Sequence, residues 1–532
     1  MLRITLALLL ACLQSQGKDP YPRNQAIDVV HYRFQLEVTD TSRLIAGEAL
    51  IKVLFKQATS KFTLDLVSSL PDGTGMLVVS ATGDRVARFS HTSNQLTLEA
   101  STPWVGEQTF SIRYRGIPRD GLIISQNKFQ ERTFFGDNWP DRGRHWLPCV
   151  DHPSDKASVE FVVIAPEQYQ VVATGKLIEE SNLPAQRKLT HWRESTPVAV
   201  KVMTVGIARF AVQLSGEPLG IPVTTWVYPQ NRTEGFHDFA VAPEVLAFFV
   251  RKVGRYTFSK LAHVQSKTRF GGLENAGNIF YFENSVNGRN ERESLIAHET
   301  AHQWFGNAAT EADWHHVWLS EGFATYFTSL YLEQKYGRER FVKEMTETKR
   351  QVLDFFKTNQ RPVVDTTIVD INQVLSVNTY QKAGWVLHML RYELGDSTFW
   401  KTMRTYYQKY QGGNALTADF QRVAEAEAGR SLSGFFQQWL FRGGHPQLAV
   451  TWHYDGRQKE VVLEIDQQQG LPFAVSLEIG LKTGAEAQLQ RVQLAGKRQK
   501  LRLPSALPPT ELVLDPGNWL LFEGNLRKTT DR

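Results

Sequence analysis

Hydrophobic and polar residues alternate along the first part of the chain. Positions 32 to 38 read YRFQLEV, and the apolar residues at positions 62, 64 and 66 repeat this spacing. A period of two residues is typical of half-buried β-strands. Similar short runs continue to about residue 228 and are separated by turn signals such as Pro71-Asp72-Gly73. We therefore predict an all-β domain over residues 19–229.

From about residue 230 the hydrophobic period becomes that of helices. Runs with helical spacing extend from Val241 to Tyr256, from Phe341 to Phe356 and from Gly384 to Leu394. The segment from Phe270 to Glu283 interrupts them with glycines and aromatic residues, a pattern that predicts a loop and a strand beside the helices. These runs indicate a mainly helical domain over residues 230–442.

A third change of pattern follows the segment Gly443-Gly444-His445-Pro446. Strand-like alternation returns at Leu448, Val450 and Trp452 and continues to the end of the chain. We predict a small β-sandwich over residues 443–532.

Length and composition agree with several soluble domains. A chain of 532 residues exceeds what one core supports, and 42% apolar with 22% charged residues is ordinary for a globular protein. The formal charge of +5 is slight and no block of Lys and Arg is present, so nucleic acid is not an expected partner.

The N-terminus has the pattern of an export signal. Arg3 precedes the apolar run Ile4 to Leu13, which is too short to span a bilayer but suits a secretory leader. We expect a signal peptide within residues 1–18, with Gly17 as the candidate residue before the cleavage site. Alternatively, Leu9-Leu10-Ala11-Cys12 resembles a bacterial lipoprotein processing box, which would anchor the chain through acylated Cys12. Either reading predicts a periplasmic or extracellular protein, and no other run of the sequence is long and apolar enough to span a membrane.

Only two cysteines are present. With Cys12 in the leader, Cys149 is the sole thiol expected in the mature chain, which excludes an internal disulfide bond. We expect Cys149 to be a packing residue.

The strongest chemical signal lies between Glu291 and Tyr326. His298 and His302 are four residues apart, so in a helix both imidazoles project from one face. Zinc in catalytic sites usually takes three protein ligands and leaves one position for water. Glu299 is placed to hold the proton of that water, and Glu321, in a second apolar helix from Ser320 to Tyr336, is the candidate third ligand.

Three motifs, which follow one another along the chain in the right order, resemble those of the gluzincin aminopeptidases, the family of aminopeptidase N and leukotriene hydrolase. His298-Glu-Thr-Ala-His302 is followed after eighteen residues by Glu321; Gly271-Gly-Leu-Glu-Asn275 resembles the exopeptidase signature; and Tyr380-Gln-Lys382 resembles the Tyr-x-Lys segment. The resemblance implies a multi-domain α+β fold. Its parts are a saddle-shaped N-terminal β-domain, a thermolysin-like and mainly helical catalytic domain, and a small C-terminal β-sandwich, without the C-terminal helical superhelix of long family members.

The resemblance also implies roles for individual residues. One Zn²⁺ per chain is held by His298, His302 and Glu321, Glu299 is the general base, and Tyr380 donates a hydrogen bond to the oxyanion. The α-ammonium of the substrate is bound by Glu274, with Gly271, Gly272 and Asn275 in the same substrate-binding loop. In the family a second residue, usually Gln or Glu, also contacts the substrate amine. This chain has Asn138 at about that place, and we consider Asn138 as the substitute.

These assignments predict a zinc-dependent aminopeptidase that acts on peptides with a free N-terminus. An endopeptidase and a non-catalytic peptide-binding protein of the same fold are the two alternatives. The preferred N-terminal residue is not readable from the sequence, because the walls of the first pocket come from segments that the motifs do not identify.

Overall fold

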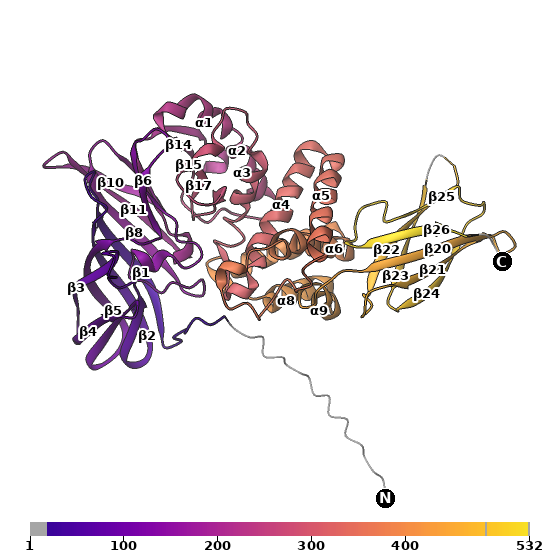
Figure 1. Ribbon diagram of the computed structural model, residues 1–532, viewed down its shortest axis with the longest axis horizontal. Helices are drawn as coiled ribbons and strands as arrows, with labels where there is room; N and C mark the ends of the chain where they lie inside the picture. The colour runs from indigo at the N-terminus through magenta and orange to yellow at the C-terminus, as the bar shows by residue number, and fades with distance from the viewer. Residues whose placement is uncertain (1–18, 485–486, 530–532) are drawn as a thin grey trace, which may run out of the picture.

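The computed structural model describes residues 19–484 and 487–529. A β-rich part, a mainly helical part and a second β-rich part follow one another along the chain and lie in that order along the long axis of the molecule (Figure 1). This order confirms the predicted succession of domain types. The expected signal peptide and Cys12 lie outside the described residues, so export and lipidation stay predictions from the sequence.

The N-terminal domain is built from two sheets. The larger one has the strand order β10-β11-β8-β1-β2-β5-β3, with β4 paired to β5, and the smaller one has the order β6-β7-β12-β9. All neighbours in the larger sheet are antiparallel except β1 and β8. The strands of both sheets are β1 (Ile27–Glu37), β2 (Ile45–Asp65), β3 (Gly75–Gly83), β4 (Val86–Thr92), β5 (Gln95–Ile117), β6 (Leu122–Gln126), β7 (Arg132–Gly136), β8 (Lys156–Pro166), β9 (Gln170–Ala173), β10 (Lys176–Leu183), β11 (Arg187–Ala199) and β12 (Val205–Ala208).

The apolar positions of the alternating pattern face the core of this domain. Tyr32, Phe34 and Leu36 of β1 are buried, whereas the residues between them are partly exposed. Cys149 is also fully buried and unpaired, as expected for a packing residue.

The next two strands belong to a different sheet from the one that the sequence suggested. β13 (Ala211–Gly216) and β14 (Val223–Val227) join β15 (Leu261–Ser266), β17 (Asn278–Phe282) and β16 (Gly272–Leu273) in the order β13-β14-β15-β17-β16. β13 and β14 lie before the expected boundary at residue 229, yet β14 pairs with β15, which follows it. Alternation marks a segment as a strand but does not reveal its partners, and this partner of β14 comes more than thirty residues later in the sequence.

Helices form the rest of the central domain. α4 (Trp318–Tyr336) packs against α3 (Glu293–Ala301), α5 (Arg338–Phe356) and α6 (Ala383–Leu394). Its C-cap is Gly337, whose φ of 86° favours glycine. The other helices are α1 (Arg232–Asp238), α2 (Ala242–Lys252), α3 (Glu293–Ala301), α5 (Arg338–Phe356), α6 (Ala383–Leu394), α7 (Asp396–Tyr410), α8 (Thr417–Ala428) and α9 (Ser433–Leu440), with the short strands β18 (Ala309–Glu311) and β19 (Gly413–Ala415) between them.

The C-terminal domain contains two sheets, as expected of a sandwich. One has the order β24-β21-β20-β26 and the other β23-β22-β25. Their strands are β20 (Gln447–Asp455), β21 (Glu460–Gln467), β22 (Val475–Lys482), β23 (Ala487–Leu494), β24 (Arg498–Pro504), β25 (Glu511–Leu514) and β26 (Glu523–Lys528). No helix within residues 19–484 or 487–529 has the length and hydropathy needed to cross a bilayer.

Buried charges join the N-terminal domain to the central one. Lys201 pairs with Glu311 of β18, and the two side chains are 1% and 0% exposed. Lys156 of β8 donates hydrogen bonds to three carbonyl oxygens of the central domain, those of Asn307 (3.1 Å), Ala308 (2.8 Å) and Gly413 (3.2 Å). Since a buried charge is costly without such partners, these contacts define how the two domains fit together.

We expect Lys201→Met to destabilise the protein by about 3–5 kcal/mol, because it leaves the Glu311 carboxylate buried without its partner. The double variant Lys201→Met/Glu311→Leu removes both charges and should recover most of this loss. Thermal and denaturant unfolding of the three proteins measures the effect. Equal destabilisation by the single and double variants would show that packing, not charge pairing, is what matters at this contact.

Candidate functional site

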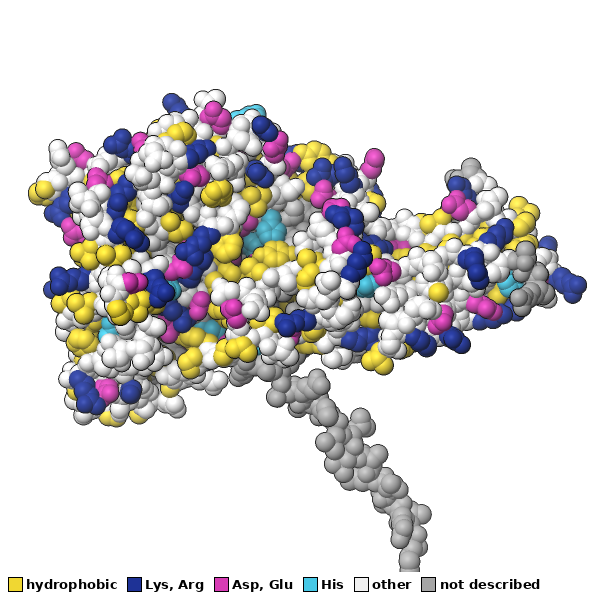
Figure 2. Space-filling model, in the orientation of Figure 1, with side chains coloured by type: hydrophobic (Ala, Val, Ile, Leu, Met, Phe, Trp, Pro, Cys, Tyr) yellow, Lys and Arg dark blue, Asp and Glu magenta, His cyan; other side chains and the backbone are white. Residues whose placement is uncertain are grey.

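Most of the residues selected from the sequence line one small cavity of about 50 Å³. Histidine and hydrophobic side chains lie next to one another toward the middle of the face that Figure 2 shows. The cavity is lined by Trp139, Phe270, Gly272, Leu273, Glu274, His298, Glu299, His302, Glu321, Leu375 and Tyr380.

Two helices present the three candidate metal ligands. His298 lies near the end of α3 and His302 is the residue at its C-terminal cap, so the imidazoles stand one turn apart. Glu321 lies in the first turn of α4, which packs against α3. The residue after it, Gly322, lets α4 approach α6 closely, because a Cβ there would lie 2.4 Å from the Cβ of Ala383.

The distances between the ligand atoms match a zinc site. The Nε2 atoms of His298 and His302 are 3.1 Å apart, and Oε2 of Glu321 lies 3.5 Å and 3.2 Å from them. Ligands at about 2.0–2.1 Å from a tetrahedral zinc ion lie about 3.3–3.4 Å from one another. Two imidazoles and a carboxylate are also a donor set that zinc prefers, so the residues fit this ion.

The orientation of His302 is set by a residue that sequence reasoning missed. Nδ1 of His302 lies 2.9 Å from Oγ of Ser320 and 3.2 Å from the carbonyl oxygen of Phe305. A proton on Nδ1 leaves the Nε2 lone pair directed at the ligand cluster. Ser320 directly precedes Glu321 in the sequence, but its spacing to His302 carries no recognisable signal.

The charges of the ligands are coupled. Burial opposes ionisation of Glu321, but His302 and His298 outweigh it and hold the pKa of its carboxyl below the ordinary range. Burial likewise disfavours the charged form of His302, yet the Glu321 carboxylate raises the pKa of that imidazole to about 10. Without a metal the pair is therefore an ionised carboxylate beside a protonated imidazole, and a metal ion would have to displace the proton from Nε2 of His302.

Glu299 projects from α3 into the same cavity. Burial, together with the carboxylates of Glu274 and Glu321, raises its pKa well above the ordinary value, although His302 acts in the opposite direction. A Cβ at Gly272 would lie 2.3 Å from Oε1 of Glu299, whereas a Cβ at Gly271 meets nothing within 4 Å. Gly272 is therefore the glycine that leaves room for the Glu299 carboxylate.

Glu274 follows the edge strand β16 and is 6% exposed. Its backbone carbonyl accepts hydrogen bonds from Nε2 of Gln303 (3.0 Å) and Nδ2 of Asn307 (2.5 Å), two residues that the motifs did not indicate. Within the described residues, Oε1 of Glu274 has no hydrogen-bond partner. The carboxylate is thus held at the cavity wall with one oxygen free to accept a hydrogen bond.

Tyr380 lies in a π-helical turn, Asn378–Lys382, directly before α6. Such turns often occur at functional sites. Its ring stacks on that of His298 with a centroid distance of 6.1 Å. Burial and the carboxylates of Glu321, Glu274 and Glu299 raise the pKa of Tyr380 well above its ordinary value, so the phenol keeps its proton and can donate it in a hydrogen bond.

Three other selected residues do not line the cavity. Gly271 lies between the lining residues Phe270 and Gly272, and Asn275, which is fully buried, follows the lining residue Glu274. Asn138 points into the core, where its Nδ2 donates to the carbonyl oxygens of Val200 (3.0 Å) and Met203 (2.8 Å) and its Oδ1 accepts from Nε1 of Trp146 (2.8 Å). Asn138 is 0% exposed and does not line the cavity, so the structure does not support its expected contact with a substrate amine.

The cavity wall also contains apolar residues that the motifs did not identify as site residues. Trp139 and Phe270 meet edge to face with a centroid distance of 5.8 Å, and Leu375 lies at the same cavity. They come from segments more than a hundred residues apart, so only folding brings them together.

The combination of this fold with a His-Glu-x-x-His helix and a downstream glutamate defines the gluzincin class of metallopeptidase domains. Residues 29–199 match the model of the peptidase M1 N-terminal domain, and residues 238–439 match that of the peptidase family M1 domain. The chain therefore belongs to peptidase family M1.

Named relatives agree with this family. The chain is 26% identical over 323 residues to the probable aminopeptidase 2 of Sulfurisphaera tokodaii, an alignment that covers 58% of this chain and 41% of the relative. It is 24% identical to the glutamyl aminopeptidase of Rattus norvegicus (74% and 43% covered) and 26% identical to aminopeptidase M1-A of Oryza sativa (69% and 43% covered). Each alignment thus spans less than half of the relative's own length.

We expect Ser320→Ala to weaken zinc binding by about 10-fold, because losing a hydrogen bond to a ligand imidazole typically costs about 10–100-fold in metal affinity and the Phe305 carbonyl retains part of the effect. Titration against a chelator of known zinc affinity measures the change. Ser329→Ala, at another buried serine of α4, is the matched control and should bind zinc as the unmodified protein does. Unchanged affinity in Ser320→Ala would assign the orientation of His302 to the Phe305 carbonyl alone.

Proposed function

We propose that the protein is a zinc-dependent aminopeptidase that removes N-terminal residues from peptides. The observation that carries this proposal is the position of Glu274. Its carboxylate shares one cavity with the His298, His302 and Glu321 cluster and has a free oxygen, as a group that binds the substrate's α-ammonium requires.

His298, His302 and Glu321 would hold the zinc ion. When bound, zinc supplies Lewis acidity, which lowers the pKa of a water molecule and polarises the scissile carbonyl group. Glu299 accepts the proton of the attacking water and passes it to the leaving amine. Its buried position keeps this proton away from bulk solvent.

Tyr380 and Glu274 complete the chemistry of the chain. The Tyr380 phenol donates a hydrogen bond to the oxygen on which negative charge develops as the carbonyl carbon becomes tetrahedral. Glu274 binds the α-ammonium by a charge-assisted hydrogen bond and so places the first peptide bond, and no later one, beside Glu299. Trp139, Phe270 and Leu375 give the cavity an apolar wall, which excludes water from these polar groups.

The amine-binding role of Glu274 predicts that aminoacyl-arylamides are hydrolysed and their N-acetylated forms are not. Glu274→Gln should lower kcat/KM for the free-amine substrate by about 10- to 100-fold, the value of one hydrogen bond to a charged group. Glu283→Gln, at a buried carboxylate outside the cavity, is the control for loss of a buried acid. Equal turnover of the free and acetylated substrates would instead favour an endopeptidase.

The contact between Gly272 and Glu299 generates a second test. Gly272→Ala should lower kcat by about 10²-fold because its methyl group displaces the Glu299 carboxylate by roughly an ångström. Gly271→Ala places the same methyl group in open space and should retain activity.

Glu299→Gln should lose about 10²–10⁴-fold in kcat, the range for removal of a general base. Metal analysis should find zinc retained in Gly272→Ala, Gly271→Ala and Glu299→Gln. Full activity of Glu299→Gln would remove Glu299 as the base, and zinc-loaded protein without any peptide hydrolysis would favour the non-catalytic alternative.

A further inference from the structure

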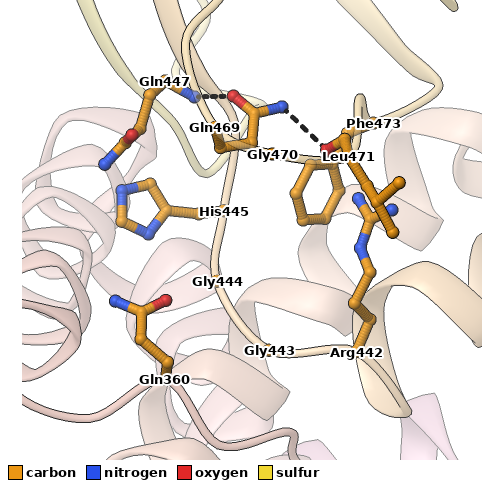
Figure 3. Close-up of a pocket in the computed structure, with 10 residues that line it drawn as sticks. All are labelled: Gln360, Arg442, Gly443, Gly444, His445, Gln447, Gln469, Gly470, Leu471 and Phe473. Carbon is orange, nitrogen blue, oxygen red and sulfur yellow. Dashed lines mark hydrogen bonds between the residues drawn. The ribbon is translucent and has the colours of Figure 1, made fainter.

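A second cavity, of about 410 Å³, lies where the helical domain meets the C-terminal domain. Its walls come from the connection between α9 and β20, from the loop between β21 and β22, and from Gln360 after α5. Figure 3 shows His445, Gln360 and Gln447 on one side and Arg442 with Phe473 and Leu471 on the other. None of these residues takes part in the zinc site.

Arg442 is held rigidly at this cavity. Its guanidinium lies 3.7 Å from the ring centroid of Phe473, and both Nη atoms donate to the carbonyl oxygen of Pro472 at 3.2 Å. The Pro472 oxygen accepts one N–H from each Nη atom. The Nε–H group and the remaining N–H group on the same side of the guanidinium stay available to another acceptor. This pair of donors matches the geometry of a carboxylate or phosphate group.

No acid neutralises Arg442. Among residues 19–484 and 487–529, no Asp or Glu oxygen forms an ion pair with its guanidinium, although most Arg residues of the chain have such a partner. The other polar side chains at the cavity wall are the amides of Gln360, Gln447 and Gln469 and the imidazole of His445.

A second basic side chain lies next to Arg442. Lys382 is fully buried, its Nζ lies 3.4 Å from the carbonyl oxygen of Arg442, and no described carboxylate forms an ion pair with it. Burial, reinforced by the Arg442 charge, lowers the pKa of Lys382 to about 7. One acid lies beside the cavity: Oε2 of Glu523 is 3.2 Å from Nε2 of His445 and 3.4 Å from Nε2 of Gln447, and its side chain is 41% exposed. Neither Arg442 nor Lys382 forms an ion pair with this carboxylate within the described residues, so the guanidinium at the opposite wall stays without an acidic partner.

The volume indicates an organic molecule and not a single inorganic ion. Ligand cavities typically measure about 300–1,000 Å³ and combine a few fixed polar groups with an apolar surface. Here Phe473 and Leu471 supply the apolar surface beside the guanidinium, and the glutamine amides supply hydrogen-bonding groups opposite.

We propose that this cavity binds a small organic anion whose carboxylate or phosphate group pairs with Arg442. The ligand contacts segments of both domains, so binding stabilises their junction. The site is separate from peptide hydrolysis, and its test does not depend on the activity proposed above.

Gly470 makes a sharp test possible. It lines the cavity, and a Cβ there meets nothing within 4 Å, so a side chain fits without displacing its neighbours. Gly470→Glu introduces a carboxylate at the wall that competes for Arg442, and Gly470→Gln is a control of the same shape without the charge. Both Gly470 variants keep Arg442 and its contact with Phe473 unchanged.

Succinate and glycerol 3-phosphate serve as probes. Their binding to the full chain is measured by isothermal titration calorimetry, and their effect on its unfolding temperature by thermal unfolding, both at constant ionic strength. We expect at least one probe to bind saturably, with one molecule per chain, and to raise the unfolding temperature. Gly470→Gln should keep the affinity for this probe, whereas Gly470→Glu and Arg442→Gln should each lower it at least about 10-fold. Binding of succinate alone identifies a carboxylate site, and binding of glycerol 3-phosphate alone identifies a phosphate site. No saturable binding of either probe, or equal affinity in Gly470→Glu and Gly470→Gln, overturns the proposal.

Discussion

The structure depends on bringing several ionisable groups together in a volume from which water is largely excluded. Glu274, Glu299 and Glu321 are all buried around one cavity, with His298 and His302 beside them. Like charges at this separation repel one another strongly when water does not screen them. A divalent cation held by the imidazoles and Glu321 would offset this repulsion, and the raised pKa of Glu299 relieves it as well, because that carboxyl keeps its proton more readily.

Glycines make this arrangement possible, because they let neighbouring groups approach where a side chain would not fit. Gly272 leaves space for the Glu299 carboxylate, and Gly322 lets α4 and α6 meet almost backbone to backbone. Since Tyr380 lies in the turn that opens α6, the contact at Gly322 also determines how far Tyr380 stands from the ligands of α4. The glycines therefore define distances in the site although they take no part in its chemistry.

Interfaces between domains carry charges that the core of a single domain would not. Lys201 and Lys156 enter the central domain from the N-terminal one and are satisfied there by Glu311 and by backbone carbonyls. At the opposite end, Arg442 and Lys382 have no such acid among the described residues. The buried cations of the first junction therefore have partners within the protein, whereas at the second junction an acidic partner could come from a bound ligand, as proposed above.

Local patterns in the sequence were sufficient for the metal ligands, the types of the elements and the order of the domains. A spacing of four residues places His298 and His302 on one helical face whatever the rest of the chain does, and alternation marks a strand before its partner is known. Tertiary structure alone decided which strand pairs with which, and so joined β13 and β14 to the sheet of β15, β17 and β16. It also turned Asn138 into the core and recruited Ser320 and Trp139 to the site. These outcomes depend on contacts between segments far apart in sequence, and periodicity within a segment carries no information about such contacts.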